Sequence, residues 1–402
     1  PEDFGLNFSF YYLFKYNHHD LAILYLDTKT KNEKLIPTLD EAIENNQLEM
    51  IYYILSSEVA INNKCFNKSK KLKKIVLPPS IISIENYAFE ECKSLTNIFI
   101  PSSIKSTGSY AFQGCSLLLK IFIPSSVELI DQYAFYDCSS LEKVSFSSSS
   151  HLYSIEQGVF SKCCSLRYIN IPSSINFINC AAFIDCKSLT KIRIPSSVKS
   201  IDDYAFQGCT SLSQISFRSS CLLNIGFSAF LFCSSLKEIT IPKSITSIGN
   251  YAFCYCCSLK NVSILSEITE INEGTFYKCI ELKEILIPSS VKQIDADAFF
   301  GCKALIKISL PNSNIIIKDG AFNGVKSIIL SDETKKIPPD TFKNCSLTHI
   351  AIPSSITSIG KGSFSGCTLL TQISIPSSVT LIEDYAFSRC SKLTQLTIPS
   401  SV

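Results

Sequence analysis

One phrase of about twenty-three residues recurs along most of this chain. The stretch IPSSVKSIDDYAFQGCTSLSQISF at 194–217 returns almost unchanged as IPSSVELIDQYAFYDCSSLEKVSF at 123–146 and as IPSSVTLIEDYAFSRCSKLTQLTI at 375–398. A chain with a fixed internal period grows along one dimension instead of closing around one large core. The repetition therefore predicts a coil of stacked turns, although 402 residues would ordinarily suggest two or three globular domains.

The phenylalanine at the centre of the phrase measures the period. Fourteen such phenylalanines follow one another at intervals of 20 to 25 residues, most often 23. They are Phe89, Phe112, Phe135, Phe160, Phe183, Phe206, Phe230, Phe253, Phe276, Phe299, Phe322, Phe342, Phe364 and Phe387. A period of 20–29 residues with a Leu-x-x-Ile-x-Ile core lies in the range of leucine-rich repeats. We therefore predict a repeat solenoid of about fourteen turns over residues 68–402.

Each phrase also predicts how one turn is built. Ile215 and Phe217 alternate with polar neighbours, which places both on one face of a short strand. Pro195 follows the preceding strand, and its missing N–H suits a position where the chain turns. Val198 and Ile201 then point inward from the back of the coil. We expect the short strands of successive turns to form a parallel sheet, about 4.8 Å from strand to strand.

The recurring text IPSSVxxIxxxAFxxCxSLxxI resembles the BspA-like leucine-rich repeat family. The resemblance covers residues 68–402, about five-sixths of the chain. That family is known from surface proteins of oral bacteria and of parasitic protists. The resemblance implies a location at the cell surface, a protein-binding role that is often adhesive or antigenic, and no enzymatic activity.

Residues 1–67 lack the repeated phrase. The segment TLDEAIENNQLEMIYYILSSEVAIN at 38–62 spaces its apolar residues as helices do, with a break at Asn45-Asn46, and predicts a helix-turn-helix. It weakly resembles one ankyrin repeat, but Asn46 and Glu58 stand where that repeat usually has glycine. We expect 1–67 to form a small helical, ankyrin-like cap on a solenoid at 68–402 that breaks off in mid-repeat at its C-terminus.

Cysteine recurs with the same period. Thirteen of the nineteen cysteines lie three residues after a repeat phenylalanine. They are Cys92, Cys115, Cys138, Cys163, Cys186, Cys209, Cys233, Cys256, Cys279, Cys302, Cys345, Cys367 and Cys390. Val325 takes this place in the remaining turn, so the position suits a small apolar group, as buried thiols are. We favour a reduced, buried ladder over disulfides, because stacked neighbours have parallel Cβ vectors and an odd number cannot pair completely.

The remaining residues offer little for catalysis or for metal binding. The chain has four histidines and no tryptophan, and Cys254-x-x-Cys257 lacks the second ligand pair that a zinc site needs. A net charge of +2 leaves no broad footprint for nucleic acid. No run of about 18 apolar residues is present, so no transmembrane helix is expected in this segment. We predict no enzyme activity, no cofactor, no metal site, no nucleic-acid binding and no membrane insertion.

The outward residues of the strands are the best candidates for ligand contact, because function in a solenoid depends on what points away from its core. In the first half, aromatic side chains alternate with cations, which is typical of anchors for a protein partner. We predict a ligand-binding patch on the concave face from Phe99, Lys120, Phe122, Lys143, Tyr168, Lys191 and Arg193. From Gln214 onward the outward positions, including Ser263, Ser309 and Ser374, are small or acidic.

Two alternatives accompany this prediction. The outward face can be an ordinary solvated surface on which Phe99 and Phe122 stack on each other. Three irregular segments, 147–152, 218–222 and 311–341, change the period and offer loops for recognition, or they reflect neutral drift.

The function that these observations favour is a non-enzymatic, protein-binding solenoid on the surface of a microbe or protist, which adheres to host or neighbouring-cell proteins. The first alternative is an intracellular scaffold in the cytoplasm or on the cytoskeleton, suggested by the ankyrin-like segment and the unpaired thiols. The second is the recognition arm of an enzyme whose catalytic domain lies outside this sequence.

Overall fold

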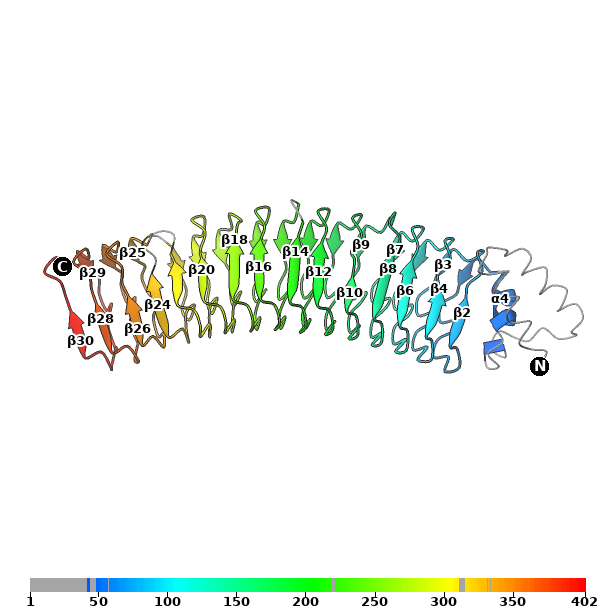
Figure 1. The fold of residues 1–402 in the computed structure, drawn as a ribbon, viewed down its shortest axis with the longest axis horizontal. Coiled ribbons are helices and arrows are strands. Elements are labelled where there is room, and N and C mark those ends of the chain that lie inside the picture. Colours follow the sequence, from blue (N-terminus) through cyan, green and yellow to red (C-terminus); the bar gives the residue numbers. More distant parts are fainter. Residues whose placement is uncertain are drawn as a thin grey trace, which may run out of the picture. The chain divides into compact units, whose positions relative to one another are not determined.

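The computed structural model describes residues 42–43, 48–56, 58–218, 221–310, 315–330, 332 and 334–402. The chain divides into two compact units, which we call unit 1 (Pro1–Ser174) and unit 2 (Ile175–Val402), and each is described by itself. Each regular turn contributes a longer strand to one sheet and a two-residue strand to the other. We call these the front sheet and the back sheet; within each unit their strands follow one another in chain order (Figure 1).

The described part of unit 1 contains helix α4 (Leu48–Ser56) and ten strands. Its front strands are β2 (Lys74–Val76), β4 (Asn97–Phe99), β6 (Lys120–Ile123), β8 (Lys143–Phe146) and β10 (Tyr168–Ile169). Its back strands are β1 (Ala60–Ile61), β3 (Ser83–Ile84), β5 (Ser106–Thr107), β7 (Leu129–Ile130) and β9 (Ser154–Ile155). Paired strands are parallel and join equivalent residues of successive turns, as Ile121 and Val144 show.

Unit 2 repeats the arrangement. Its front strands are β12 (Lys191–Ile194), β14 (Gln214–Phe217), β16 (Glu238–Ile241), β18 (Asn261–Ile264), β20 (Glu284–Leu286), β22 (Lys307–Ser309), β24 (Ser327–Leu330), β26 (His349–Ala351), β28 (Gln372–Ser374) and β30 (Gln395–Thr397). Its back strands are β11 (Phe177–Ile178), β13 (Ser200–Ile201), β15 (Asn224–Ile225), β17 (Ser247–Ile248), β19 (Glu270–Ile271), β21 (Gln293–Ile294), β23 (Ile316–Ile317), β25 (Lys336–Ile337), β27 (Ser358–Ile359) and β29 (Leu381–Ile382). The predicted fold is confirmed: a parallel-strand solenoid of about fourteen turns of roughly 23 residues.

The repeat phenylalanines form the centre of each core. Within unit 1 the rings of Phe89 and Phe112 lie 5.2 Å apart with an interplanar angle of 3°, and the stack also includes Phe66. Phe66 precedes the first phenylalanine of the sequence ruler, and β1 pairs with β3 beside it, so the ladder extends one turn further toward the N-terminus. Because no turn can bury its own ring, the repetition creates a core that forms only between neighbouring turns.

The ladder cysteines have a specific bonding role in addition to filling space. At least eleven of the thirteen donate the S–H to the carbonyl oxygen of the repeat phenylalanine one turn earlier, at 2.9–3.3 Å. Cys115 Sγ, for example, bonds to the oxygen of Phe89 at 3.2 Å. Burial raises the pKa of these thiols, that of Cys92 to about 12. The valine at position 325 fits the space but cannot donate this bond.

The serines of the Pro-Ser-Ser turns connect successive coils. Ser197 Oγ donates to the carbonyl oxygen of Ile175 at 2.6 Å, and Ser290 Oγ to that of Ile268 at 2.8 Å. Each bond satisfies a carbonyl near the end of the previous turn. In these two turns the second serine joins neighbouring turns, and the proline before the pair ends the strand. The equivalent hydroxyls of Ser103 and Ser126 are buried without a hydrogen-bond partner among the described residues.

Every regular turn bends twice through left-handed backbone, two residues before and two residues after the repeat phenylalanine. In the turn of Phe135 these positions are Tyr133 (φ 57°) and Asp137 (φ 55°). Gly158 occupies the first position in the next turn, where an added Cβ would lie 2.2 Å from Cε1 of Tyr133. Glycine lets the tyrosine ring lie directly over the backbone and adopts the positive φ (62°) without strain.

The ladders between the described strands are interrupted at three changes in the period, and also between turns of regular length, as between β4 and β6 or between β17 and β19. In the described part of unit 1 no ladder joins β7 to β9, which flank 147–152, and in that of unit 2 none joins β14 to β16 or β23 to β25. Pro338 explains the last gap. Lys318 N donates to Ile294 O and Gly360 N to Ile337 O, each at the residue after its short strand. Pro338 takes that place after β25 and has no N–H to donate to Ile317.

The helical prediction for 38–62 lies partly within the described residues. Helix α4 includes Ile51, Tyr52 and Leu55, all buried, and Ala42 and Ile43 are helical and buried as well. The break at Asn45-Asn46 and the segment before residue 42 lie outside the described residues.

Candidate functional site

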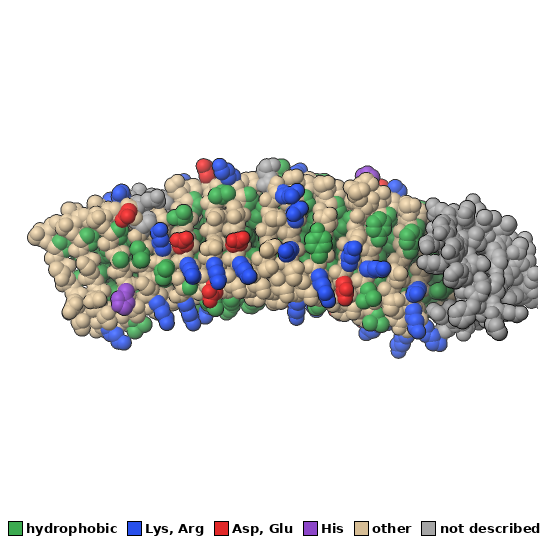
Figure 2. All heavy atoms as spheres, in the orientation of Figure 1, with side chains coloured by type: hydrophobic (Ala, Val, Ile, Leu, Met, Phe, Trp, Pro, Cys, Tyr) green, Lys and Arg blue, Asp and Glu red, His purple; other side chains and the backbone are tan. Residues whose placement is uncertain are grey.

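The aromatic patch of unit 1 lies on the front sheet, where alternate strand residues point away from the core. We define this patch as Phe99, Leu119, Lys120, Phe122, Lys143 and Tyr168. The burial pattern of β6 shows the alternation, with Lys120 and Phe122 exposed and Ile121 and Ile123 buried. Figure 2 shows hydrophobic side chains standing between Lys and Arg side chains over β6, β8 and β10.

The aromatic rings of this patch are exposed and do not stack on one another. Phe99 and Tyr168 are each 56% exposed and Phe122 is 50% exposed. Phe99 and Phe122 hold the same position in successive strands, but no ring contact joins them in the described part of unit 1. The alternative in which these two rings cover each other is therefore wrong. Their apolar surface remains open to water, an arrangement that folding does not require.

Lys120 and Lys143 are directly opposite each other in the pairing of β6 with β8, and Tyr168 pairs with Lys143 on the other side. Like charges on facing residues destabilise a sheet. Among the residues described, neither lysine forms an ion pair, and Glu142 before β8 is the nearest carboxylate in sequence. Both charges are thus without an opposite charge in contact within the described part of unit 1.

Sequence reasoning did not identify one member of the patch. Leu119 precedes β6 and is 49% exposed; its carbonyl accepts the backbone N–H of Glu142 in the next turn. The signal was present, because an apolar residue stands there where most other turns carry Thr, Lys, Ser, Glu or Arg; Ile306 is the equivalent residue of a turn in unit 2.

Lys191 and Arg193, the last two residues predicted for the site, lie on β12 in unit 2. Both are exposed, and they pair with Gln214 and Ser216 of β14. They extend the prediction to the front sheet of unit 2 without entering the aromatic patch of unit 1 as defined here.

The prediction for the rest of the front face of unit 2 is corrected in two respects. Ser309 is only 3% exposed, so neighbouring residues cover it and it offers no surface to a ligand. Large apolar side chains are exposed there as well: Leu286 is 69% exposed and Ile329 50%. Figure 2 also shows a row of Lys or Arg side chains over β16, β18 and β20, where Lys237, Lys260 and Lys283 are exposed.

The described residues contain no group of three or more His, Cys, Asp or Glu side chains placed to hold a metal ion. No helix within the described ranges is long and apolar enough to cross a membrane.

Comparison with known proteins places this geometry among leucine-rich repeats. The model of the BspA type leucine-rich repeat region matches six copies over residues 59–190, 177–306 and 298–402. A leucine-rich repeat protein from Bacteroides ovatus is 27% identical over 82% of each chain, with a TM-score of 0.59. A leucine-rich cell surface protein from Faecalibacterium prausnitzii is 29% identical over 83% of this chain and 84% of its own, with a TM-score of 0.45. No curated protein matches.

Proposed function

Because this chain belongs to the BspA-type leucine-rich repeat family, we propose that it is a non-catalytic, protein-binding solenoid displayed at a cell surface, where it adheres to proteins of a host or of neighbouring cells. Leucine-rich repeat proteins generally serve as scaffolds for protein interaction. Family membership supports the surface location, and the aromatic patch supports the binding activity.

The aromatic patch carries the proposal because it has the chemistry of a binding hot spot. Three large rings and Leu119 provide apolar area, and the facing Lys120 and Lys143 provide unneutralised positive charge. Aromatic anchors in a rigid frame bury area at a low entropic cost. We infer that the partner presents an apolar surface bordered by Asp and Glu, which the lysines attract and orient.

Binding is tested with the triple variant F99A/F122A/Y168A and a matched control, Y153A. Tyr153 is 56% exposed, like Phe99 and Tyr168, but precedes the back strand β9. Affinity for the partner identified by cross-linking to intact cells should fall by about 2 kcal/mol or more in the triple variant. It should be unchanged in Y153A. Equal affinity of both variants would remove the patch from the proposed function.

The charge contribution has its own signature. Lys120→Glu with Lys143→Glu should reduce the association rate and reverse its dependence on salt, because exposed charges act mainly on encounter. Stopped-flow association at several salt concentrations measures this. An unchanged salt dependence would mean that the lysines face no acidic surface.

The surface location is tested by labelling intact cells that carry the protein with an antibody against unit 2. Labelling before permeabilisation supports display at the surface. Labelling only after permeabilisation would favour the alternative of an intracellular scaffold, for which the hydrogen-bonded ladder thiols are the specific observation.

A further inference from the structure

The front sheet of unit 2 contains a change of register between neighbouring strands. Lys307, the first residue of β22, pairs with Ile329, the third residue of β24. Ser327, the first residue of β24, pairs instead with His349, the first residue of β26. The alignment therefore shifts by two residues within three strands. A two-residue shift preserves which side chains point inward, so the core remains intact while the outer surface becomes uneven.

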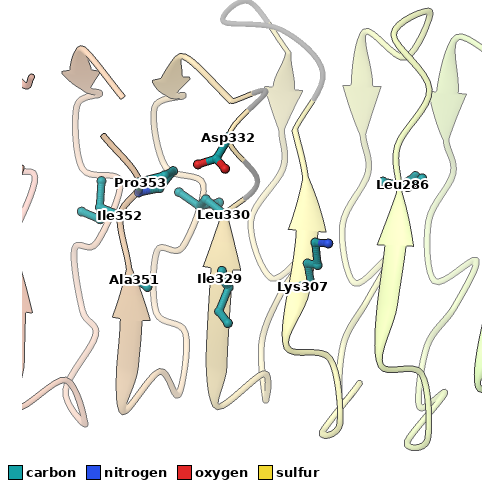
Figure 3. A pocket seen from close by; sticks show the side chains of 8 residues that line it. All are labelled: Leu286, Lys307, Ile329, Leu330, Asp332, Ala351, Ile352 and Pro353. Atoms are coloured by element: carbon teal, nitrogen blue, oxygen red, sulfur yellow. The ribbon is translucent and has the colours of Figure 1, made fainter. Parts of the chain in front are cut away.

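A groove of about 430 Å³ lies on the outer surface at this shift. We call it the register groove; Leu286, Lys307, Ile329, Leu330, Asp332 and Pro353 line it (Figure 3). Leu330 ends β24 without a partner in β26, where the chain continues into Ile352-Pro353. The groove thus opens where the two-residue shift leaves the ends of adjacent strands unmatched.

The register groove combines an apolar surface with two opposite charges. Leu286 is 69% exposed and Ile329 50%, and Ile306, whose carbonyl accepts the N–H of Ile329, is 49% exposed. In Figure 3, Lys307 extends from β22 and Asp332 stands beyond the end of β24. Neither charge forms an ion pair within the described part of unit 2. Exposed aliphatic side chains gathered at one place mark a binding surface more often than single ones do.

The charges near the groove are unevenly distributed along the strands. Lys283 and Lys326 are exposed, and they immediately precede β20 and β24, the strands on either side of the strand that begins with Lys307. Glu284, the first residue of β20, contributes one negative charge to this group. Asp332 lies at the other end, beyond β24. Cations therefore prevail where the strands start, and an anion stands where they end.

We propose that the register groove binds an extended polypeptide segment of a partner protein, with one large aliphatic or aromatic side chain seated between Leu286 and Ile329. The groove crosses four adjacent strands, about 14 Å at the spacing of a sheet. An extended chain covers this distance with about four or five residues. The segment carries Asp or Glu on the side of Lys307, and it donates N–H groups or presents a cation to Asp332.

This site is separate from the aromatic patch in residues, location and chemistry. The aromatic patch offers broad rings flanked by cations, whereas the register groove offers a hollow with both signs of charge. A failure of either proposal leaves the other intact.

The test uses a set of fluorescent nine-residue peptides in a Gly-Ser background, measured by anisotropy with the whole chain. The central residue is Leu, Phe or Ala, and two Asp or two Lys residues stand on one side. We expect central Leu or Phe with Asp on one side to bind at least tenfold more tightly than central Ala. L286A/I329A should abolish this preference, and K307E should remove the preference for Asp while retaining that for the central residue.

Two controls separate the groove from other surfaces. T240A/S374A changes exposed residues of the same sheet outside the groove, and F99A/F122A/Y168A changes the aromatic patch; both should bind the peptides as the native chain does. Thermal unfolding of L286A/I329A should match that of the native chain, because both side chains are exposed. Absence of a preference for a large central residue, or equal binding by L286A/I329A, would overturn the proposal. A loss confined to F99A/F122A/Y168A would also overturn it.

Discussion

Two stretches of unit 2 follow the same repeat with different regularity. In 221–310, Phe230 stacks on Phe253 at an interplanar angle of 1°, and every ladder position holds a cysteine that donates its S–H. In 315–353, Phe322 and Phe342 are tilted by 49°, and valine replaces the cysteine. Proline also interrupts the back ladder there, and the front register shifts by two residues. The interior tolerates this irregularity because inward residues remain inward, although the ring stack and one ladder residue change together with the surface.

This difference suggests how a repeat protein acquires specificity. Regular turns present equivalent surfaces, one after another, because each copies its neighbour. A deletion of two or three residues leaves the stack continuous but changes the side chains that meet on the front sheet. The register groove is the local product of such a change. The experiments below test the difference between the two stretches, beginning with the largest expected effect.

The largest expected effect appears at alkaline pH, where the regular stretch depends on its thiols. Burial raises the pKa of the ladder thiols Cys233, Cys256 and Cys279 of this stretch well above the ordinary value of 9.0. It raises that of Cys367, a ladder thiol nearer the C-terminus, to about 12. The folded chain thus keeps protons that the unfolded chain releases, so stability is complete below about pH 9 and is lost as the pH rises toward 12. Urea unfolding midpoints measured from pH 7 to 11 should fall only above pH 9. A flat profile would contradict the buried, protonated ladder.

Removing a ring should cost more in the regular stretch than in the irregular one. Phe230→Ala should destabilise unit 2 by roughly 3–5 kcal/mol, as large-to-small core changes do. Phe342→Ala should cost about 1 kcal/mol less, because its tilted contact with Phe322 has less stacking to lose. Tyr385→Ala is the control, since Tyr385 is 70% exposed. Chemical denaturation measures all three; a larger loss for Phe342→Ala would invert the comparison.

The residues at the ladder position, cysteine in the regular stretch and valine in the irregular one, can be exchanged. Cys279→Val removes the S–H that Phe253 O accepts at 3.2 Å and adds a methyl group to a filled site, so it should cost about 1–2 kcal/mol. Val325→Cys should be nearly neutral, because the new bond to Phe299 O offsets the lost methyl group. Differential unfolding measurements decide between these expectations. Equal and opposite effects would mean that only volume matters at this position.

The smallest effect concerns the gap between β23 and β25. Pro338→Ala supplies an N–H for Ile317 O, a gain of about 1 kcal/mol that the added freedom of the unfolded chain largely offsets. Hydrogen exchange gives the clearer result. The new amide at position 338 of the variant should exchange about as slowly as that of Gly360, whose N–H bonds to Ile337 O at 2.8 Å. Rapid exchange at this amide would show that the proline is not what separates the strands.

Much of the fold could be predicted from the sequence, because the period and the alternation of apolar residues are visible in short segments of it. Phe206 and Cys209 are buried as expected, and Lys120 and Phe122 are exposed as expected. The burial of Ser309 was missed because the alternation of a three-residue strand ends there, and its cover depends on neighbouring strands. The exposure of Leu286 was not predicted, because most turns of unit 2 have a small residue at the equivalent outward position.

The sequence by itself determined the stacking of turns, the side that each strand residue faces and the position of the thiol ladder, since each of these repeats within one period. Only the tertiary structure decided that the thiols donate to the phenylalanine carbonyls, that Phe99 and Phe122 stay apart, and that β24 shifts by two residues against β22. These features depend on atoms of two or three turns at once. No single phrase encodes them, because register is a relation between strands and not a property of either one.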